Sequence, residues 1–377
     1  MDIANDGRAI AAALLMVASC SGDGPTTPSP DATTPLDPCA PFAPDPSFEA
    51  LELDGAALST IYGVWGLADD DIYVAIGGQS QPSPNETRMA IAHWNGSTWA
   101  LDRLSNVVRI DAMSGRSGAD LWLSAIVVPG HRAMLRNGGG SGWASTSMPH
   151  SFVYDMLLLP PDDGWMTASA PGQLEKGVTL RLNGDWTEAA LPARSDSYSF
   201  RELSARDAQH VYGIGHVDGA MDGDLLGAFD GKSWKTVRAP SECGVALEDV
   251  VGVAPDAIYT IGTTYSSLRT RNVCRVSSDL GAWKPVGSVP YGGSPQGVAA
   301  TAGGTVVPIW ANLIAGTASV FAVVRGDVLK ATCELSPGLG DFVAWSAPAS
   351  PNVHVFSGLS GGNAGAPARH LVKRFDP

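Results

Sequence analysis

Long apolar runs, charged residues and cysteines are all scarce in this sequence, and each shortage narrows the range of functions. Beyond the first 20 residues, no apolar run approaches the ~18 residues that a membrane-spanning helix needs. Charged residues make up only 16% of the chain, and the net charge of −14 argues against a nucleic-acid partner and against electrostatic adhesion to anionic lipid. The motifs HExxH, GxSxG, GxGxxG opening a helix and the EF-hand loop are absent.

Side chains that hold metals or cofactors are also poorly grouped. The 7 histidines show no metal-ligand spacing, and we predict no cofactor and no catalytic residues. Three carboxylates, Asp218, Asp222 and Asp224, lie in one glycine-containing stretch and could supply oxygen ligands to calcium. Their irregular spacing favours a solvated acidic turn, so calcium is the weaker alternative and we predict no metal site.

What the sequence does contain is a repeat with a period in the forties, present in seven copies. Each copy has an apolar strand, a turn at Asp, Gly or Pro, a second strand that often carries an aromatic residue, and two shorter strands. A repeat of this length with several short strands per copy predicts a β-propeller, whose units bury their apolar faces against one another. The second strands begin at Asp71, Asp120, Asp163, His210, Ala257, Thr305 and, loosely, Val353.

The last two strands of each copy are joined by a regular tight turn. Asn-Gly and Asp-Gly pairs favour the positive φ angles of hairpin turns, and a Trp follows each one. The turns are Asn95-Gly96, Asn137-Gly138, Asn183-Gly184, Asp230-Gly231 and the Asp279/Gly281 pair. The copies resemble kelch and Asp-box propeller repeats, although Ser277-x-Asp279-x-Gly281-x-Trp283 is one residue short of the Asp box of sialidases. The resemblance therefore implies the architecture without assigning a subfamily.

The two ends of the sequence predict how the propeller closes. The seventh copy stops after its third strand, and the alternating segment from Phe48 to Leu53 is a candidate for the missing fourth strand. Pairing it with the C-terminal copy would remove the exposed sheet edges. We therefore predict an all-β, seven-bladed propeller over residues 47–377, closed by an N-terminal strand, with six blades as the alternative if the weak sixth copy is an insertion.

The N-terminus reads as a processing segment rather than as part of the fold. Arg8 precedes an apolar stretch, and Val17-Ala18-Ser19-Cys20 resembles the lipobox of bacterial lipoproteins, although Asp2 and Asp6 make the start unusually acidic. The resemblance implies a signal peptide over residues 1–19, a diacylated Cys20 and, because Ser21 is not Asp, an outer-membrane anchor facing either the periplasm or the exterior. Residues 20–46 are rich in Pro, Thr, Asp and Ser and are typical of a flexible tether.

Four cysteines remain once Cys20 is assigned to lipid. In an exported protein they predict two disulfides, with three possible connectivities. We favour Cys243–Cys274, since both lie within one repeat, which leaves Cys39–Cys333.

One position of the first strand is polar in every copy when the copies are aligned. Buried ionisable groups are costly without partners or water, so this position is expected at a wet channel mouth. The residues at this position form either a ligand-binding ring or a hydrated lining of the channel mouth. The loops between the second and third strands are expected to surround the same mouth. Arg269 and Arg271 give one of these loops positive charge that could meet a carboxylated glycan or peptide. The ring residues are Tyr62, Asp111, Tyr154, Arg201, Glu248, Gln296 and Asp341.

Three functions fit this organisation. The first is a monomeric, non-enzymatic binding module for a glycan, a peptide or an envelope protein, attached to the membrane only by its lipid. The second is a sialidase-like glycosidase or lyase, and the third is a purely structural envelope protein. An enzyme of the second class needs several arginines with paired carboxylates and a tyrosine, whereas the aligned position offers a single arginine, Arg201. The sequence therefore favours the binding module.

Overall fold

The computed structural model describes residues 43–44, 51–53, 56–58, 60–78, 89–138, 142–148, 150, 152–192, 198–217, 223–254, 257–264, 270–290, 294–311, 320–334, 342–347, 350–357 and 369–374. All of them lie in one compact unit, Leu36–Pro377. No helix among these residues has the length and apolar character that a bilayer crossing requires. The single helical turn among them is η1 (Ser241–Cys243).

The unit consists of seven blades of four antiparallel strands, which we number 1 to 7; the single pair Gly223–Leu247 joins blades 4 and 5 into one eight-stranded sheet, and a short two-stranded sheet lies outside the blades. Blade 1 contains β4 (Thr60–Ala68), β5 (Asp71–Gly77), β6 (Met89–Trp94) and β7 (Trp99–Leu104). Blade 2 contains β8 (Val107–Ser117), β9 (Asp120–Val127), β10 (His131–Asn137) and β11 (Trp143–Ser147). Blade 3 contains β12 (Val153–Leu159), β13 (Asp163–Ala170), β14 (Gln173–Asn183) and β15 (Asp185–Glu188).

The remaining four blades repeat the pattern. Blade 4 contains β16 (Tyr198–Asp207), β17 (His210–Val217), β18 (Gly223–Phe229) and β19 (Trp234–Arg238). Blade 5 contains β20 (Ala246–Ala254), β21 (Ala257–Thr264), β22 (Thr270–Val276) and β23 (Trp283–Pro290). Blade 6 contains β24 (Ser294–Ala300), β25 (Thr305–Ala311), β26 (Val320–Arg325) and β27 (Val328–Glu334). Blade 7 contains β28 (Phe342–Trp345), β29 (Asn352–Ser357), β30 (Arg369–Arg374) and β1 (Ala43–Pro44).

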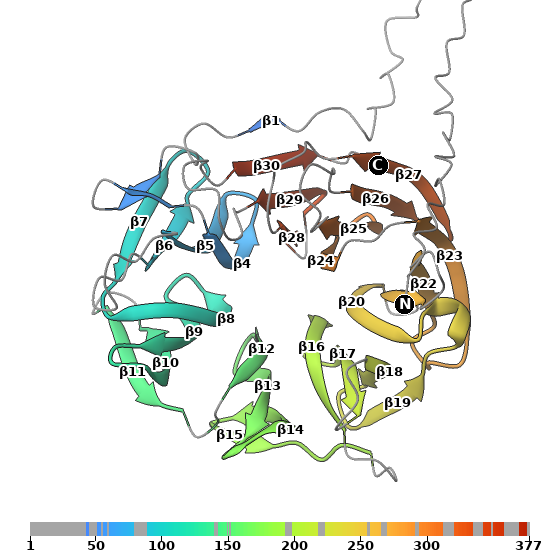
Figure 1. The fold of residues 1–377 in the computed structure, drawn as a ribbon, viewed down its shortest axis with the longest axis horizontal. Helices are drawn as coiled ribbons and strands as arrows, with labels where there is room; N and C mark the ends of the chain where they lie inside the picture. The colour runs from blue at the N-terminus through green and yellow to red at the C-terminus, as the bar shows by residue number, and fades with distance from the viewer. Residues whose placement is uncertain are drawn as a thin grey trace, which may run out of the picture. The chain divides into compact units, whose positions relative to one another are not determined.

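The blades form a closed ring. Each first strand contacts the first strand of the next blade, from β4 through β8, β12, β16, β20 and β24 to β28, which contacts β4 again (Figure 1). The predicted seven-bladed propeller is therefore confirmed and the six-bladed alternative is wrong, because the weak sixth copy forms a complete blade of its own.

The predicted starts of the second strands and three of the five predicted hairpin turns are also confirmed. Of the other two turns, Gly138 has no positive φ angle, and in the Asp279/Gly281 turn the positive φ angle, 64°, belongs to Leu280. Six of the seven second strands begin at the predicted residue, and β29 begins one residue earlier, at Asn352. Gly96, Gly184 and Gly231 have φ angles of 86°, 78° and 86°, as the hairpins require. These turns rest on local chemistry, which explains why the sequence revealed them.

The closing strand is N-terminal, as predicted, but it is a different segment. Ala43 pairs with Val372 and Pro44 with Leu371, so β1 supplies the fourth strand of blade 7 and lies before the predicted boundary at residue 47. The assignment of Phe48–Leu53 as the closing strand is therefore wrong. Phe48 to Ala50 lie outside the described residues, and Glu52 and Leu53 form β2 (Glu52–Leu53), which pairs with β3 (Ala56–Ala57). Leu51 and Leu53 are partly buried against a core cluster that includes Leu58 and Phe356, so the alternation marks a hairpin that covers this cluster.

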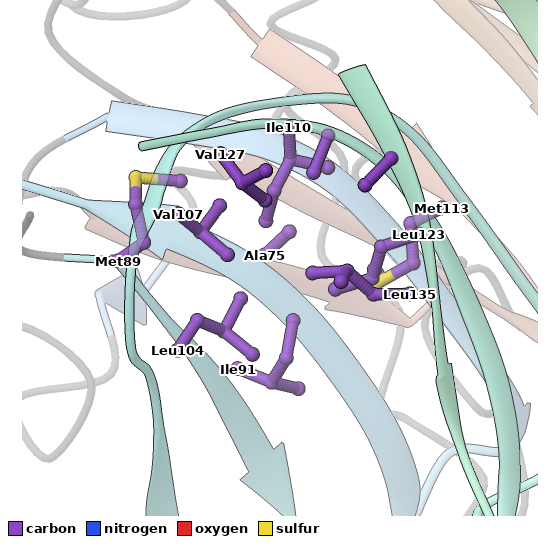
Figure 2. Packing of buried hydrophobic residues seen from close by; sticks show 12 residues of the cluster. Ala75, Met89, Ile91, Leu104, Val107, Ile110, Met113, Leu123, Val127 and Leu135 are labelled. Atoms are coloured by element: carbon purple, nitrogen blue, oxygen red, sulfur yellow. The ribbon is translucent and has the colours of Figure 1, made fainter. Parts of the chain in front are cut away.

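The core lies between neighbouring blades. Figure 2 shows the cluster between blades 1 and 2, where Ile91 and Leu104 of blade 1 face Ile110, Leu123 and Leu135 of blade 2. Burying such side chains contributes about 1.5–3 kcal/mol each and is the main force that holds one blade to the next.

Aromatic side chains of the second strands reach across the blade boundaries into spaces kept open by glycine. A Cβ added at Gly118 would lie 2.0 Å from the hydroxyl oxygen of Tyr73, in the preceding blade. A Cβ added at Gly252 would lie 2.1 Å from the ring of buried Tyr212 in the same way. The recurring aromatic residue therefore acts as a wedge between blades.

The cysteine prediction is confirmed for one pair. Cys243 and Cys274 form a disulfide with their Cα atoms 5.6 Å apart, and both are fully buried. Cys333 is also disulfide-bonded, but Cys39, its predicted partner, lies outside the described residues, as does Cys20.

Candidate functional site at the mouth where the first strands begin

The predicted ring residues occupy an unusual backbone position. In blades 1 to 6 the pairing register between the first and second strands shifts at the ring residue, so that the ladder of paired residues skips it. Each ring residue there is thus the extra residue of a β-bulge, a feature that redirects side chains at the rims of β-structures. The bulged residues are Tyr62, Asp111, Tyr154, Arg201, Glu248 and Gln296; the side chain of Gln296 and the whole of Asp341 lie outside the described part of the protein.

Blade 2 joins two arginines to one buried carboxylate at this mouth. Nε of Arg109 lies 2.8 Å from Oδ1 of Asp111, and Nη1 of Arg132 donates a hydrogen bond to Oδ2. The side chain of Asp111 is 0% exposed, whereas those of Arg109 and Arg132 are 49% and 25% exposed. Arg109 and Arg132 both pair in register with Ile126, from opposite sides, so the sheet itself brings them together.

Aromatic rings continue this arrangement into blades 3 and 4. The guanidinium carbon of Arg132 lies 4.4 Å from the ring centre of Phe152, whose ring is 5.0 Å from that of Tyr154. Arg201 in turn lies 5.2 Å from the ring centre of Tyr154. We call Arg109, Arg132, Phe152, Tyr154 and Arg201 the Arg–aromatic strip. Cation–π contacts at these distances contribute about 0.5–1 kcal/mol each at exposed sites and hold the guanidinium planes in place.

Tyr62 stands beside the strip in blade 1. Burial raises the pKa of its hydroxyl, and the positive charge of Arg109 acts in the opposite direction. The phenol therefore stays neutral at physiological pH and can donate or accept a hydrogen bond.

The remaining ring residue with a described side chain is already paired. Glu248 accepts a hydrogen bond from Nη1 of Arg271, and the two side chains are 23% and 7% exposed. Arg271, which the sequence placed on an open loop, is thus mostly buried. Arg269 lies outside the described residues, as do Asp218 and Asp222, and Asp224 lies in β18 with its side chain undescribed.

Three carboxylates that the sequence did not reveal lie one residue further along the first strands of blades 3 to 5. Asp155 accepts hydrogen bonds from the backbone N–H of Met156 at 2.7 Å and, in the next blade, from that of Leu203 at 2.8 Å. Asp249 does the same with Val250, at 2.7 Å, and with Val298 of blade 6. Each of these two aspartates therefore connects neighbouring blades, and the third carboxylate is Glu202 of blade 4.

These inner carboxylates carry raised pKa values. Burial raises the pKa of Asp155 and of Asp249 to about 7, and their N–H donors only partly offset it. The side chain of Glu202 is exposed to water along part of its surface, but protein atoms surround its carboxyl group. This desolvation, together with the charges of Asp155 and Asp249, raises the pKa of Glu202 well above its ordinary value. The positive charge of Arg201 lowers this pKa and offsets part of the shift. These raised pKa values favour the protonated, uncharged form of the three inner carboxyls.

Asp111 and Glu248, the ring carboxylates that a glycosidase could use, are both held by arginines. In the ranges described above, no three His, Cys, Asp or Glu side chains are grouped to hold a metal ion.

The opposite end of the ring contains a separate cavity of about 320 Å³. It is lined by the ends of the first strands of blades 4 to 7, including Arg206, Val251, Thr301 and Trp345, and by none of the ring residues.

Comparisons with known proteins support the fold. No protein-family model matches the sequence, and no curated protein sequence matches it. Among solved structures, YCF48 bound to a D1 peptide is 12% identical with a TM-score of 0.55, covering 90% of this protein and 97% of its own length. YCF48 from Cyanidioschyzon merolae is 14% identical with a TM-score of 0.54, covering 88% and 98%. A component of the mitotic checkpoint complex is 10% identical with a TM-score of 0.52, covering 93% and 99%. At these identities the likeness shows the β-propeller architecture alone.

Proposed function

We propose that this propeller is a non-enzymatic binding module that takes a segment of polypeptide at the mouth where the first strands begin. The observation that carries the proposal is the Arg–aromatic strip, which spans three blades around bulged positions. Arginine and tyrosine dominate the energetics of protein interfaces because they combine flat apolar surface with directed hydrogen bonds. One structural neighbour, YCF48, has been solved with a peptide bound, which supports a polypeptide over a glycan.

The strip also meets the energetic requirements of a binding surface. Its side chains are already ordered by stacking and by Asp111, so a ligand does not bear the usual cost of about 0.5–1.5 kcal/mol per immobilised side chain. The rigid ring of blades keeps these groups in place.

A peptide-display selection on the full-length protein tests this proposal. We expect the selected peptides to lose about tenfold or more in affinity when Tyr154→Ala and Arg201→Ala are combined. A matched control combines Leu67→Ala and Lys284→Ala, exposed positions away from the mouth, and should bind as the parent does. Failure to select any peptide, or equal binding by both variants, would contradict the proposal.

We also propose that the protein is exported and anchored to the outer membrane by lipid on Cys20, after removal of residues 1–19. The buried disulfide Cys243–Cys274 supports export, since such bonds persist in oxidising compartments. Expression in a Gram-negative bacterium with a labelled fatty acid tests it: the label should enter the parent, and not Cys20→Ser, and should follow the outer-membrane fraction. An unlabelled parent protein would contradict the anchor.

A further inference from the structure

The charges of the blade 2 cluster do not balance. Two guanidinium groups, Arg109 and Arg132, share the single carboxylate of Asp111, which leaves an excess positive charge in a protein whose net charge is −14. The other arginine cluster of blade 2 is balanced, because Arg116 pairs with Asp120 and with Asp162 of blade 3, and Arg136 pairs with Asp120.

From this imbalance we infer that Arg109 and Arg132, oriented by Asp111, form a binding site for a carboxylate group of the polypeptide ligand. The inference rests on the proposed function and gives it a ligand chemistry. The carboxylate is either that of an Asp or Glu side chain or that of a free C-terminus, and both present the same two oxygens.

The donors needed for such a ligand are present. A guanidinium has five N–H donors; Nη1 of Arg132 is hydrogen-bonded to Asp111, and Nε of Arg109 lies 2.8 Å from Oδ1 of Asp111 as an ion pair. The side chains of Arg109 and Arg132 are 49% and 25% exposed, so they are open to an incoming anion. Arginine and carboxylate form paired hydrogen bonds that are about twice as strong as neutral ones.

The surroundings hold the site ready and select what enters it. Asp111 accepts a hydrogen bond from Nη1 of Arg132 and forms an ion pair with Arg109, and the ring centre of Phe152 lies 4.4 Å from the guanidinium carbon of Arg132. Phe152 and Tyr154 add apolar surface for a residue next to the bound carboxylate.

Short peptides of known charge test the site on the full-length protein. The probes are tetraglutamate and tetraglutamine with both ends blocked, and tetraglutamine with a free C-terminus, each carrying an uncharged fluorophore for anisotropy. Tetraglutamate should bind at least about tenfold more tightly than blocked tetraglutamine. The third probe distinguishes a C-terminal carboxylate from a side-chain one. Equal binding of all three probes would overturn the inference.

A matched pair of variants locates the effect. Arg132 and Arg136 lie on the same strand, and each pairs with an aspartate and stacks on an aromatic ring, but Arg136 faces the balanced cluster. Arg132→Gln should weaken tetraglutamate binding about tenfold, whereas Arg136→Gln should leave it unchanged. Equal losses in both variants would indicate diffuse electrostatics and overturn the site.

A second measurement needs no variant. Affinity of the parent protein for tetraglutamate should fall as salt rises from about 0.05 M to about 0.3 M, and a salt-independent affinity would contradict the inference.

If display-selected peptides require Tyr154 and Arg201 but bind Arg132→Gln normally, the carboxylate site is wrong and the proposed function stands. If no peptide is selected, both fall.

Discussion

The buried carboxylate of Asp249 gives a prediction whose sign follows from the structure. Its oxygens accept the N–H groups of Val250 and, in the next blade, Val298, and burial raises its pKa from the ordinary 3.8 to about 7. Below pH 3.8 the group is protonated in both the folded and the unfolded protein. Between that value and about 7 only the unfolded protein has lost the proton, so the free energy of unfolding falls as pH rises.

The size of the effect follows from the same shift. Each pH unit in that window lowers the free energy of unfolding by about 1.4 kcal/mol. The total loss by neutral pH is on the order of 4 kcal/mol. Asp249→Asn removes this dependence because an amide does not ionise. The amide has one acceptor oxygen for two N–H donors, so the variant also loses one hydrogen bond, at about 1–3 kcal/mol, at every pH. Relative to the parent, Asp249→Asn should therefore be less stable at acidic pH and should gain stability as pH rises.

Urea unfolding followed by tryptophan fluorescence at about pH 4.5 and about pH 8 measures this difference directly. Asp230→Asn is a control without this dependence, since the backbone N–H groups of Ser233 and Lys232 lower the pKa of that exposed carboxyl from 3.8. The stabilising contribution of Asp230 is present above the unfolded pKa and is lost only at lower pH, so this variant should differ from the parent by nearly the same amount at about pH 4.5 and at about pH 8. The reasoning is refuted if Asp249→Asn also differs from the parent by the same amount at both pH values.

Three further predictions concern the ring itself. Replacing Cys243 and Cys274 by Ser opens a loop with a sequence separation of 31 residues and should lower the free energy of unfolding by about 3–4 kcal/mol. Urea unfolding measures this loss, and an unchanged unfolding midpoint would contradict the prediction. Asp69→Ala removes a carboxylate that accepts hydrogen bonds from three side chains of blade 7 and should lower the free energy of unfolding by about 2–4 kcal/mol. Amide hydrogen exchange should become faster in blades 1 and 7 but not in blade 4. Gly252→Ala places a methyl group against a buried tyrosine ring and should lower stability by about 1–3 kcal/mol, whereas Gly138→Ala, with open space around it, should not.

The sequence revealed those parts of the fold that depend on local chemistry. The turns before Asp71 and Asp120 and the hairpins at Gly96 and Gly231 were predictable because few residue types adopt those backbone conformations. The closing strand was not, because β1 is two residues long and pairs through backbone groups that carry no side-chain pattern. The alternation of the later segment reflected burial of Leu51 and Leu53 against the core instead.

The site was only partly predictable for a related reason. Aligning the copies located Tyr62, Asp111 and Tyr154, but a bulge sets two consecutive residues against one partner, so a period of two fails there. The adjacent carboxylates, such as Asp155, were overlooked for that reason. The pairing of Arg109 with Arg132 depends on the register of three strands, and no spacing in the sequence encodes it.

Mapping where an acidic peptide attaches tests the central claim most directly, namely that the Arg–aromatic strip recognises acidic polypeptide. Tetraglutamate carrying a photoreactive group would be cross-linked to the full-length protein and the modified residues identified by mass spectrometry. The account predicts modification at or beside Phe152 and Tyr154, suppressed in Arg132→Gln and retained in Arg136→Gln. Modification concentrated around Trp345 at the opposite end, or unaffected by Arg132→Gln, would contradict it.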